Sequence, residues 1–230
     1  MPHALILKAT QHIVNYANDN GTPVIFFSTD LVFDGKKGAY TESDAPNPVN
    51  YYGETKLLAE QSVLNALESN IVCRIALSYG KNAPEAKGGY LDKLLEGIQA
   101  GKKQFLFTDQ YRTPLYSGDL CQATAILLEH MVHGNSGKVS RIFHLGGPDT
   151  LSRYQIGEQT AQIFGFSLQL LCPVTMADIQ NKVQRGSDCS LSIDRAKHEL
   201  GFVPRNMKEC LHRDKQMREE KQKNGNFNRN

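Results

Sequence analysis

A tyrosine and a lysine four residues apart are the feature of this 230-residue sequence that most directly suggests chemistry. Tyr52 and Lys56 would lie on one face of a helix, because positions i and i+4 are neighbours on a helix surface. A phenol with an ordinary pKa near ~10 is a weak acid–base group at neutral pH. A cation held nearby stabilises the phenolate and brings that pKa towards a useful range. Taken alone, the spacing is better explained by a surface tyrosine and lysine on an ordinary helix.

Hydroxyl groups precede this helix at the end of an apolar run. Residues 24–27 predict a parallel strand that is covered on both faces, and Ser28 and Thr29 follow it directly. Ligands of open α/β sheets bind at the carboxyl ends of the strands. The simpler interpretation is that the two hydroxyls cap the turn that follows. The features nevertheless follow one another in a definite order along the chain. The strand and its two hydroxyl residues come first, then a loop over residues 34–50, and then the helix with the tyrosine and the lysine.

Alternating helices and strands are expected to position these groups. Apolar residues at every fourth position, Leu5, Ala9, Ile13 and Ala17, predict a helix before the first strand. The helix–strand alternation continues along the chain and predicts an α/β fold with a parallel sheet. The expected helices cover residues 4–18, 51–67, 90–100, 118–133 and 194–200, with one more opened by a Ser152–Gln155 capping box, and the expected strands cover residues 24–27, 71–75, 105–107 and 142–144.

Composition and charge exclude several classes of protein. The net charge is +2, and no basic stripe is interleaved with aromatic residues, so a nucleic-acid partner is not expected. The apolar stretches are far shorter than the ~20 residues that cross a membrane, and the sequence does not begin like a signal peptide. Five scattered cysteines without a C-x-x-C pair indicate neither a disulfide framework nor a metal site. A reducing, cytoplasmic compartment is therefore expected.

The combined motifs resemble the extended short-chain dehydrogenase/reductases, and within them the dTDP-4-dehydrorhamnose reductase group of sugar-nucleotide reductases. The resemblance spans residues 4–202. The dehydratases of this superfamily have Asp-Glu where this chain has Asp30-Leu31. Its epimerases more often have Val-Tyr-Gly where this chain has Val-Phe-Asp-Gly at residues 32–35. Both differences favour a reductase. The segments that carry the resemblance are residues 27–35, 39–48, 52–56, 112–114, 144–148, 151–153 and 188–191.

The resemblance implies a role for each residue of the predicted catalytic set. Tyr52 would protonate the sugar carbonyl oxygen while NADPH or NADH supplies a hydride. Lys56 would bind the nicotinamide ribose and tune Tyr52. Thr29 would hydrogen-bond the reacting oxygen and Tyr52.

Further residues are implied in binding. Ser28, Ala76 and Ser78 would line the cofactor pocket beside Tyr52 and Lys56. Arg112 and Arg185 would anchor the diphosphate of a nucleotide-sugar substrate, because a guanidinium fork suits phosphate oxygens. The alternatives are a structural role for Arg112 and a surface salt bridge for Arg185.

The implied fold is an incomplete Rossmann-type doubly wound parallel sheet with a small C-terminal α/β substrate-binding region. Residues 1–80 would form the remaining part of the NAD(P)-binding domain, residues 81–212 the substrate-binding region interleaved with late Rossmann elements, and residues 213–230 a disordered tail. The sequence holds no G-x-G-x-x-G motif, so we expect the family's glycine-rich N-terminal segment to be lacking. The strand at residues 24–27 would then form an apolar sheet edge.

Three functions remain open at this stage. The first is NAD(P)H-dependent reduction of a nucleotide-linked 4-keto sugar, requiring the lacking segment. The second is a non-catalytic regulatory subunit resembling the β subunit of methionine adenosyltransferase, which shares the same motifs. The third is an inactive remnant. The expected partners are a nucleotide-sugar substrate and either a second copy of the chain, as a homo-oligomer, or a regulatory partner subunit.

Overall fold

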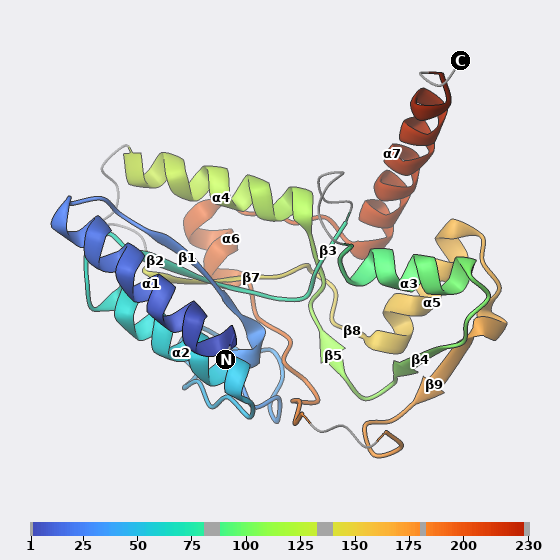
Figure 1. Cartoon of the computed structure of the whole chain (residues 1–230), viewed down its shortest axis with the longest axis horizontal. Helices are drawn as coiled ribbons and strands as arrows, with labels where there is room; N and C mark the ends of the chain where they lie inside the picture. Colours follow the sequence, from blue (N-terminus) through green and yellow to red (C-terminus); the bar gives the residue numbers. More distant parts are fainter. Residues whose placement is uncertain (1, 81–87, 133–139, 180–182, 228–230) are drawn as a thin grey trace.

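The computed structural model of the chain describes residues 2–80, 88–132, 140–179 and 183–227 (Figure 1). None of the helices in these ranges has both the length and the apolar character needed to cross a bilayer.

A three-stranded parallel sheet lies at the centre of the fold. Its strand order is β1 (Ile25–Thr29), β2 (Ile71–Ile75) and β7 (Ile142–Leu145). The last residues of the three strands are paired in register, so their carboxyl ends are level. The predicted parallel α/β fold is confirmed.

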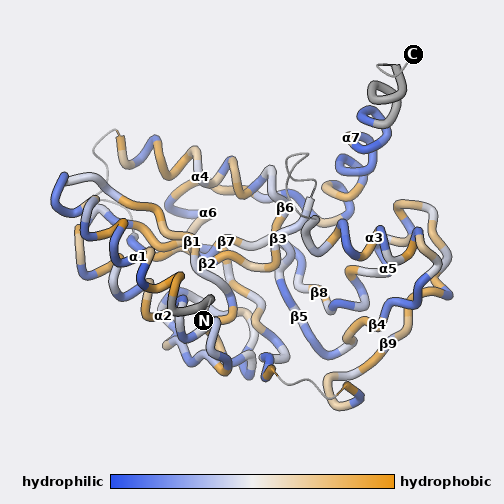
Figure 2. Tube along the Cα trace, in the orientation of Figure 1, coloured by the Kyte–Doolittle hydropathy of each residue, from blue (hydrophilic) through white to orange (hydrophobic). Residues whose placement is uncertain are grey.

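Helices cover both faces of this sheet (Figure 1). On one face lie α1 (Pro2–Asp19) and α2 (Tyr51–Leu64), and on the other α4 (Ser117–Val132) and α6 (Asp194–Leu200). Val72 packs towards α1 and α2, whereas its neighbour Cys73 packs towards α4 and α6. This alternation follows from the period of two along a strand. Figure 2 shows the apolar character of the sheet strands that both helical layers cover.

A second, smaller group of elements lies beside the sheet (Figure 1). Helices α3 (Tyr90–Gln99) and α5 (Arg153–Phe164) pack on the parallel pair β4 (Gln104–Phe107) and β9 (Leu171–Val174). The expected Ser152–Gln155 capping box begins α5. Two-residue strands join the two groups, β3 (Ser78–Tyr79) with β6 (Leu115–Tyr116) and β5 (Tyr111–Arg112) with β8 (Leu151–Ser152).

The helix predicted before the first strand is confirmed, but its predicted apolar face is only partly right. Among the side chains that the structure describes in α1, Val14 and the predicted Ala17 are buried, while the predicted Leu5 is 69% and Ile13 62% exposed. The neighbouring strand β1 is the edge of the described sheet, and Phe27 is 39% exposed, so β1 is not fully covered on both faces as predicted. The expected apolar sheet edge is therefore present.

The predicted disorder of residues 213–230 is wrong for the part that the structure describes. Helix α7 (Met207–Phe227) continues through this region. The Asp214 carboxylate is completely buried and pairs with Arg218, which also pairs with Asp92 of α3. Charged residues that the sequence suggests are exposed to solvent thus form one ion pair within α7 and one with α3. Residues 228–230 lie outside the described residues.

Candidate active site

The first turn of α2 is fixed against the end of β1. The Asn50 side chain accepts a hydrogen bond from Gly53 N at 3.0 Å and caps the helix. A Cβ atom on Gly53 would lie only 2.2 Å from Leu31 O, in the short 3-10 turn that follows β1 (Asp30–Val32). Only glycine allows this close approach. Tyr52 is thereby held beside the carboxyl end of β1.

Tyr52 and Lys56 are both half-buried, and their surroundings favour the neutral form of each. Burial, with a further contribution from the negative charge of Asp30, raises the pKa of the Tyr52 phenol. Burial lowers the pKa of Lys56, whereas the nearby Glu60 opposes this effect. The expected lowering of the Tyr52 pKa by Lys56 is therefore wrong for the chain without ligands. Because its pKa is raised, Tyr52 is protonated at neutral pH and can act as an acid.

The Lys56 ammonium reaches the outer edge of the sheet. Its Nζ donates to Phe27 O and lies 4.1 Å from the centre of the Phe26 ring. Val24 O accepts a hydrogen bond from Ile71 N on β2. Main-chain carbonyls point to alternate sides along a strand, so the carbonyl of Phe27, three residues later, points away from β2. Lys56 thus covers a main-chain acceptor at the open edge of β1.

Thr29 lies at the same end of β1 and is buried. Its hydroxyl donates to Asp30 Oδ1 at 3.1 Å and accepts from Leu31 N at 3.2 Å. A hydroxyl has one donor and two acceptor positions, so one acceptor position remains for a ligand or for Tyr52. Thr29 at the end of β1, Tyr52 in the first turn of α2 and Lys56, bound to Phe27 O, therefore lie around one edge of the sheet, and their catalytic roles remain predictions.

The predicted cofactor-lining residues lie around the same strand ends. Ser28 is buried, and its Oγ has no hydrogen-bond partner in the described part of the chain. Ala76 directly follows β2, where its N donates to Leu145 O at 3.0 Å. Ser78 is exposed in β3. A buried hydroxyl without a partner is unusual and marks a place where a polar ligand group fits.

Arg112 does not match its expected role as a diphosphate anchor. Its side chain is 2% exposed, and its Nε lies 3.2 Å from Asp30 Oδ2. The remaining donors bind main-chain carbonyls of Tyr111, Gly186 and Ser187. Arg112 therefore has a structural role: it connects the segment after residue 185 to the end of β1. The sequence alone could not identify these partners.

Arg185 is exposed and lies next to the predicted site. The preceding residue, Gln184, accepts through its main-chain oxygen from Asn50 Nδ2 at 3.3 Å. The following residue, Gly186, packs so closely on Asp34 that a Cβ atom would lie 2.6 Å from Asp34 O. Arg185 makes no ion pair with any residue that the structure describes, so the alternative of a surface salt bridge receives no support.

A row of buried polar side chains supports the site, although sequence reasoning assigned no role to any of them. Arg74 of β2 donates to Glu60 of α2, with Nη2 2.8 Å from Oε2, and its Nη1 lies 3.5 Å from His144 Nε2. His144 Nδ1 lies 2.9 Å from Tyr40 O. Burial, together with the Arg74 charge, lowers the pKa of His144 to about 3, so the ring is neutral and donates to Tyr40. This row fixes α2 to the sheet one turn beyond Lys56.

A second feature that sequence reasoning missed is the pair of arginines around Asp30. Burial raises the pKa of Asp30, while Arg112 and then Arg153 oppose this rise through their charges. Arg153 begins α5, on the other side of the β1 end from α2 (Figure 1). Only its position in the Leu-Ser-Arg segment, residues 151–153, could have drawn attention to it.

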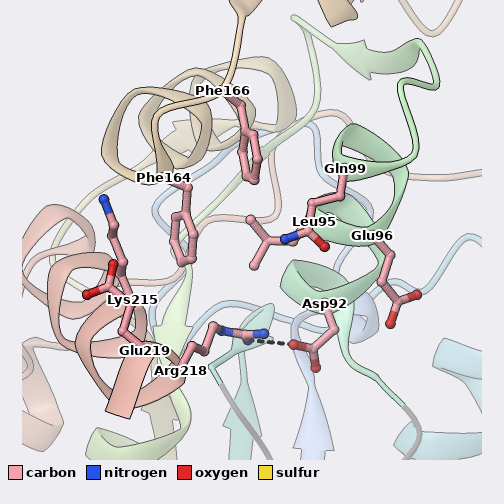
Figure 3. Close-up of a pocket in the computed structure, with 9 residues that line it drawn as sticks. All are labelled: Asp92, Leu95, Glu96, Gln99, Phe164, Phe166, Lys215, Arg218 and Glu219. Carbon is pink, nitrogen blue, oxygen red and sulfur yellow. Dashed lines mark hydrogen bonds and ion pairs between the residues drawn. The ribbon is translucent and has the colours of Figure 1, made fainter. Parts of the chain in front are cut away.

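A pocket of about 360 Å³ lies away from these residues, between α3, the end of α5 and α7 (Figure 3). Leu95, Phe164 and Phe166 form its apolar side, and the Asp92–Arg218 ion pair lies at its border. None of the predicted site residues lines this pocket.

Comparisons with known proteins identify relatives of the chain. The chain is 30% identical over 186 residues to a probable low-salt glycan biosynthesis reductase, Agl14, of Haloferax volcanii, covering 80% of the chain and 60% of that protein. It is 28% identical over 176 residues to methionine adenosyltransferase 2 subunit beta of Danio rerio, covering 76% of the chain and 54% of that protein. The chain thus spans little more than half the length of these relatives.

Solved structures show the same fold. A dTDP-4-dehydrorhamnose reductase of Bacillus anthracis in complex with NADP matches with a TM-score of 0.77 and 19% identity, covering 89% of this chain and 69% of that one. A family model, described as the RmlD substrate binding domain, matches residues 3–217. The chain therefore belongs to the RmlD substrate binding domain family, within the extended short-chain dehydrogenase/reductases.

Proposed function

We propose that this chain carries the reaction centre of a reductase that uses NADPH or NADH to reduce the 4-keto group of a nucleotide-linked sugar. The observation that carries the proposal is the placement of Tyr52 and Lys56 on α2 beside Thr29 at the carboxyl end of β1. The name of the Haloferax relative and the NADP in the Bacillus structure support a reductase and a nicotinamide cofactor.

The residues at the end of β1 fit the nicotinamide half of the cofactor. Ser28 offers a buried hydroxyl without a partner, and Lys56 offers an ammonium bound to a single main-chain carbonyl. Together with the main chain at Ala76 and Ser78, these groups would hold the nicotinamide and its ribose. When bound, the cofactor would supply a hydride to the sugar carbon.

The protein's own contribution is the proton and its control. Tyr52 is protonated at neutral pH and would donate its phenol proton to the keto oxygen, which becomes a hydroxyl. The Lys56 charge would stabilise the phenolate that remains. Thr29 donates its own proton to Asp30, so it would act through its remaining acceptor position, which can receive a hydrogen bond from a hydroxyl group of the sugar.

The exposed Arg185 would bind the substrate diphosphate, since it lies beside the start of α2 and has no ion-pair partner among the described residues. We place the activity in a reducing, cytoplasmic compartment, because all five cysteines are free thiols.

The test is the oxidation of NADPH by a dTDP-4-keto-6-deoxy sugar, followed through the loss of reduced-nicotinamide absorbance. Tyr52→Phe should lower the rate by roughly 10²- to 10⁴-fold, the usual loss for a general acid. Tyr51→Phe is the matched control on the same helix turn, 54% exposed, and should retain the rate. Equal rates for the two variants would contradict the proposed role of Tyr52.

A second candidate is a non-catalytic regulatory subunit, favoured by the similarity to methionine adenosyltransferase 2 subunit beta. Under this hypothesis the chain binds a methionine adenosyltransferase, and no keto sugar is reduced by the wild type or by any variant. Sedimentation of the chain with a purified methionine adenosyltransferase, beside the reduction assay, separates the two functions. Failure of both assays by a folded chain would leave an inactive remnant.

A further inference from the structure

Two buried polar atoms near the end of β1 have no hydrogen-bond partner among the described residues. They are Nη1 of Arg153, at the start of α5, and Oη of Tyr90, at the start of α3. A donor left unpaired inside a protein costs free energy, because it loses its bonds to water and gains none. Such atoms mark a place where a ligand can supply the missing partner.

The Arg153 side chain is held on one side only. Its main-chain N donates to Gln110 O at 3.1 Å, next to the β5–β8 pair, and its Nε donates to Gln110 Oε1 at 3.2 Å. Its guanidinium lies 4.7 Å from the centre of the Tyr90 ring, a cation–π arrangement. These contacts fix the plane of the guanidinium. The Tyr90 hydroxyl and the guanidinium also act on one another, but Nη1 makes no hydrogen bond of normal geometry to any described residue.

The charges around Arg153 do not balance. Asp30 is the carboxylate that acts on it, and the same carboxylate already pairs with Arg112 at 3.2 Å. Two guanidinium groups therefore face one carboxylate in a largely buried place. Buried cations are normally matched by anions, so one negative charge is missing.

We propose that Arg153, with the Tyr90 hydroxyl beside it, binds phosphoryl oxygens of the nucleotide-linked substrate. This inference rests on the proposed function, and it gives Arg153 the anchoring role that the sequence suggested for Arg112. A guanidinium with a free edge forms paired, charge-assisted hydrogen bonds with phosphate oxygens.

These phosphoryl oxygens would come from the substrate and not from the cofactor. Lys56 and Ser28, which would hold the nicotinamide ribose, lie on β1 and on the α2 side of it. Arg153 lies on the side of α3 and α5, beyond Asp30 (Figure 1). The two ligands would therefore approach Tyr52 from opposite sides, as hydride transfer to a sugar requires.

Calorimetric titration of the 230-residue chain tests this with three probes: dTDP, inorganic pyrophosphate and NADPH. Arg153→Met keeps the aliphatic stem and should weaken dTDP and pyrophosphate binding roughly tenfold to hundredfold, the loss of one or two charge-assisted hydrogen bonds. NADPH affinity should not change.

The dTDP affinity of Arg153→Lys should lie between those of the wild type and Arg153→Met. Tyr90→Phe should weaken dTDP binding less than Arg153→Met does. Arg213→Gln, an exposed arginine on α7, is the matched control.

Thermal unfolding separates a binding role from a structural one. Arg153→Met loses the hydrogen bond to Gln110 and the contact of the charge with the Tyr90 ring, so it should lower the melting temperature by a few degrees at most while it weakens dTDP binding. A lower melting temperature with unchanged dTDP affinity would overturn the proposal, and so would wild-type protein that binds neither dTDP nor pyrophosphate. Equal weakening of NADPH binding would assign the site to the cofactor and also overturn it. Arg153-dependent dTDP binding without keto-sugar reduction would reject the proposed function alone.

Discussion

At the scale of single residues, the contact that fixes the proposed site is the buried ion pair between Glu60 and Arg74. Their side chains are 2% and 3% exposed. Glu60→Gln would leave the Arg74 charge without its carboxylate in the interior, which typically costs about 3–5 kcal/mol. Glu54→Gln, exposed on the same helix, should change the free energy of unfolding by less than about 0.5 kcal/mol. Urea denaturation measures both, and equal losses would contradict the buried pair.

His144 predicts a pH dependence of stability. Its pKa is about 3 in the folded chain and ordinarily 6.5, so between these values the unfolded chain binds a proton that the folded chain does not. Stability is therefore complete above about 6.5 and falls as the pH drops towards about 3, by about 1.4 kcal/mol per pH unit. Urea denaturation at several pH values should show this slope in His198→Gln, an exposed control, and not in His144→Gln. The same slope in both variants would reject this contribution.

At the scale of elements, the first turns of helix α7 make a direct prediction. Leu211 is fully buried in a cluster with residues of α3 and α5, and its neighbour His212 is exposed. Leu211→Ala should lower the free energy of unfolding by about 2–5 kcal/mol, the usual cost of such a cavity. His212→Ala should change it by less than about 0.5 kcal/mol. Equal changes for the two variants would contradict the packing of α7 on α3 and α5.

Helix α1 allows a test of which face it buries. Val14 is 2% exposed, whereas Ile13 borders an apolar hollow of about 330 Å³ on the outer surface. Val14→Gln should cost at least about 1.5 kcal/mol, because it removes a buried apolar side chain and buries an amide. Ile13→Gln should stay within about 0.5 kcal/mol of the wild type. Chemical denaturation of the two neighbouring variants decides between the predicted and the observed face.

At the scale of the whole molecule, the sequence was informative where local signals are strong. The strand at residues 71–75 and the helix at residues 194–200, which Gly201 ends in the left-handed conformation, have the predicted bounds. The two-residue strands β3, β5, β6 and β8 were missed, because so short a segment has no period to detect. Periodicity also assigned a partly wrong face to α1, since burial there depends on which elements lie beside it.

The candidate site was predictable in part for the same reason. The Tyr52–Lys56 spacing is local and visible in the sequence, and so is the strand end at Thr29. The partner of Arg112 and the unpaired atom of Arg153 depend on contacts between segments far apart in the chain. No pattern in the sequence specifies which carboxylate a given arginine will meet, so their roles emerge only from the fold.

The most direct test of the proposed reaction centre is a fluorescence titration of the chain with NADPH and with reduced nicotinamide mononucleotide, which lacks the adenosine half. Because the residues at the end of β1 fit the nicotinamide and its ribose, both probes should bind saturably. Lys56→Met should weaken both at least tenfold, with an unchanged circular-dichroism spectrum. Absence of saturable binding by the folded wild type, or equal affinities in Lys56→Met, would contradict a nicotinamide site at Tyr52 and Lys56.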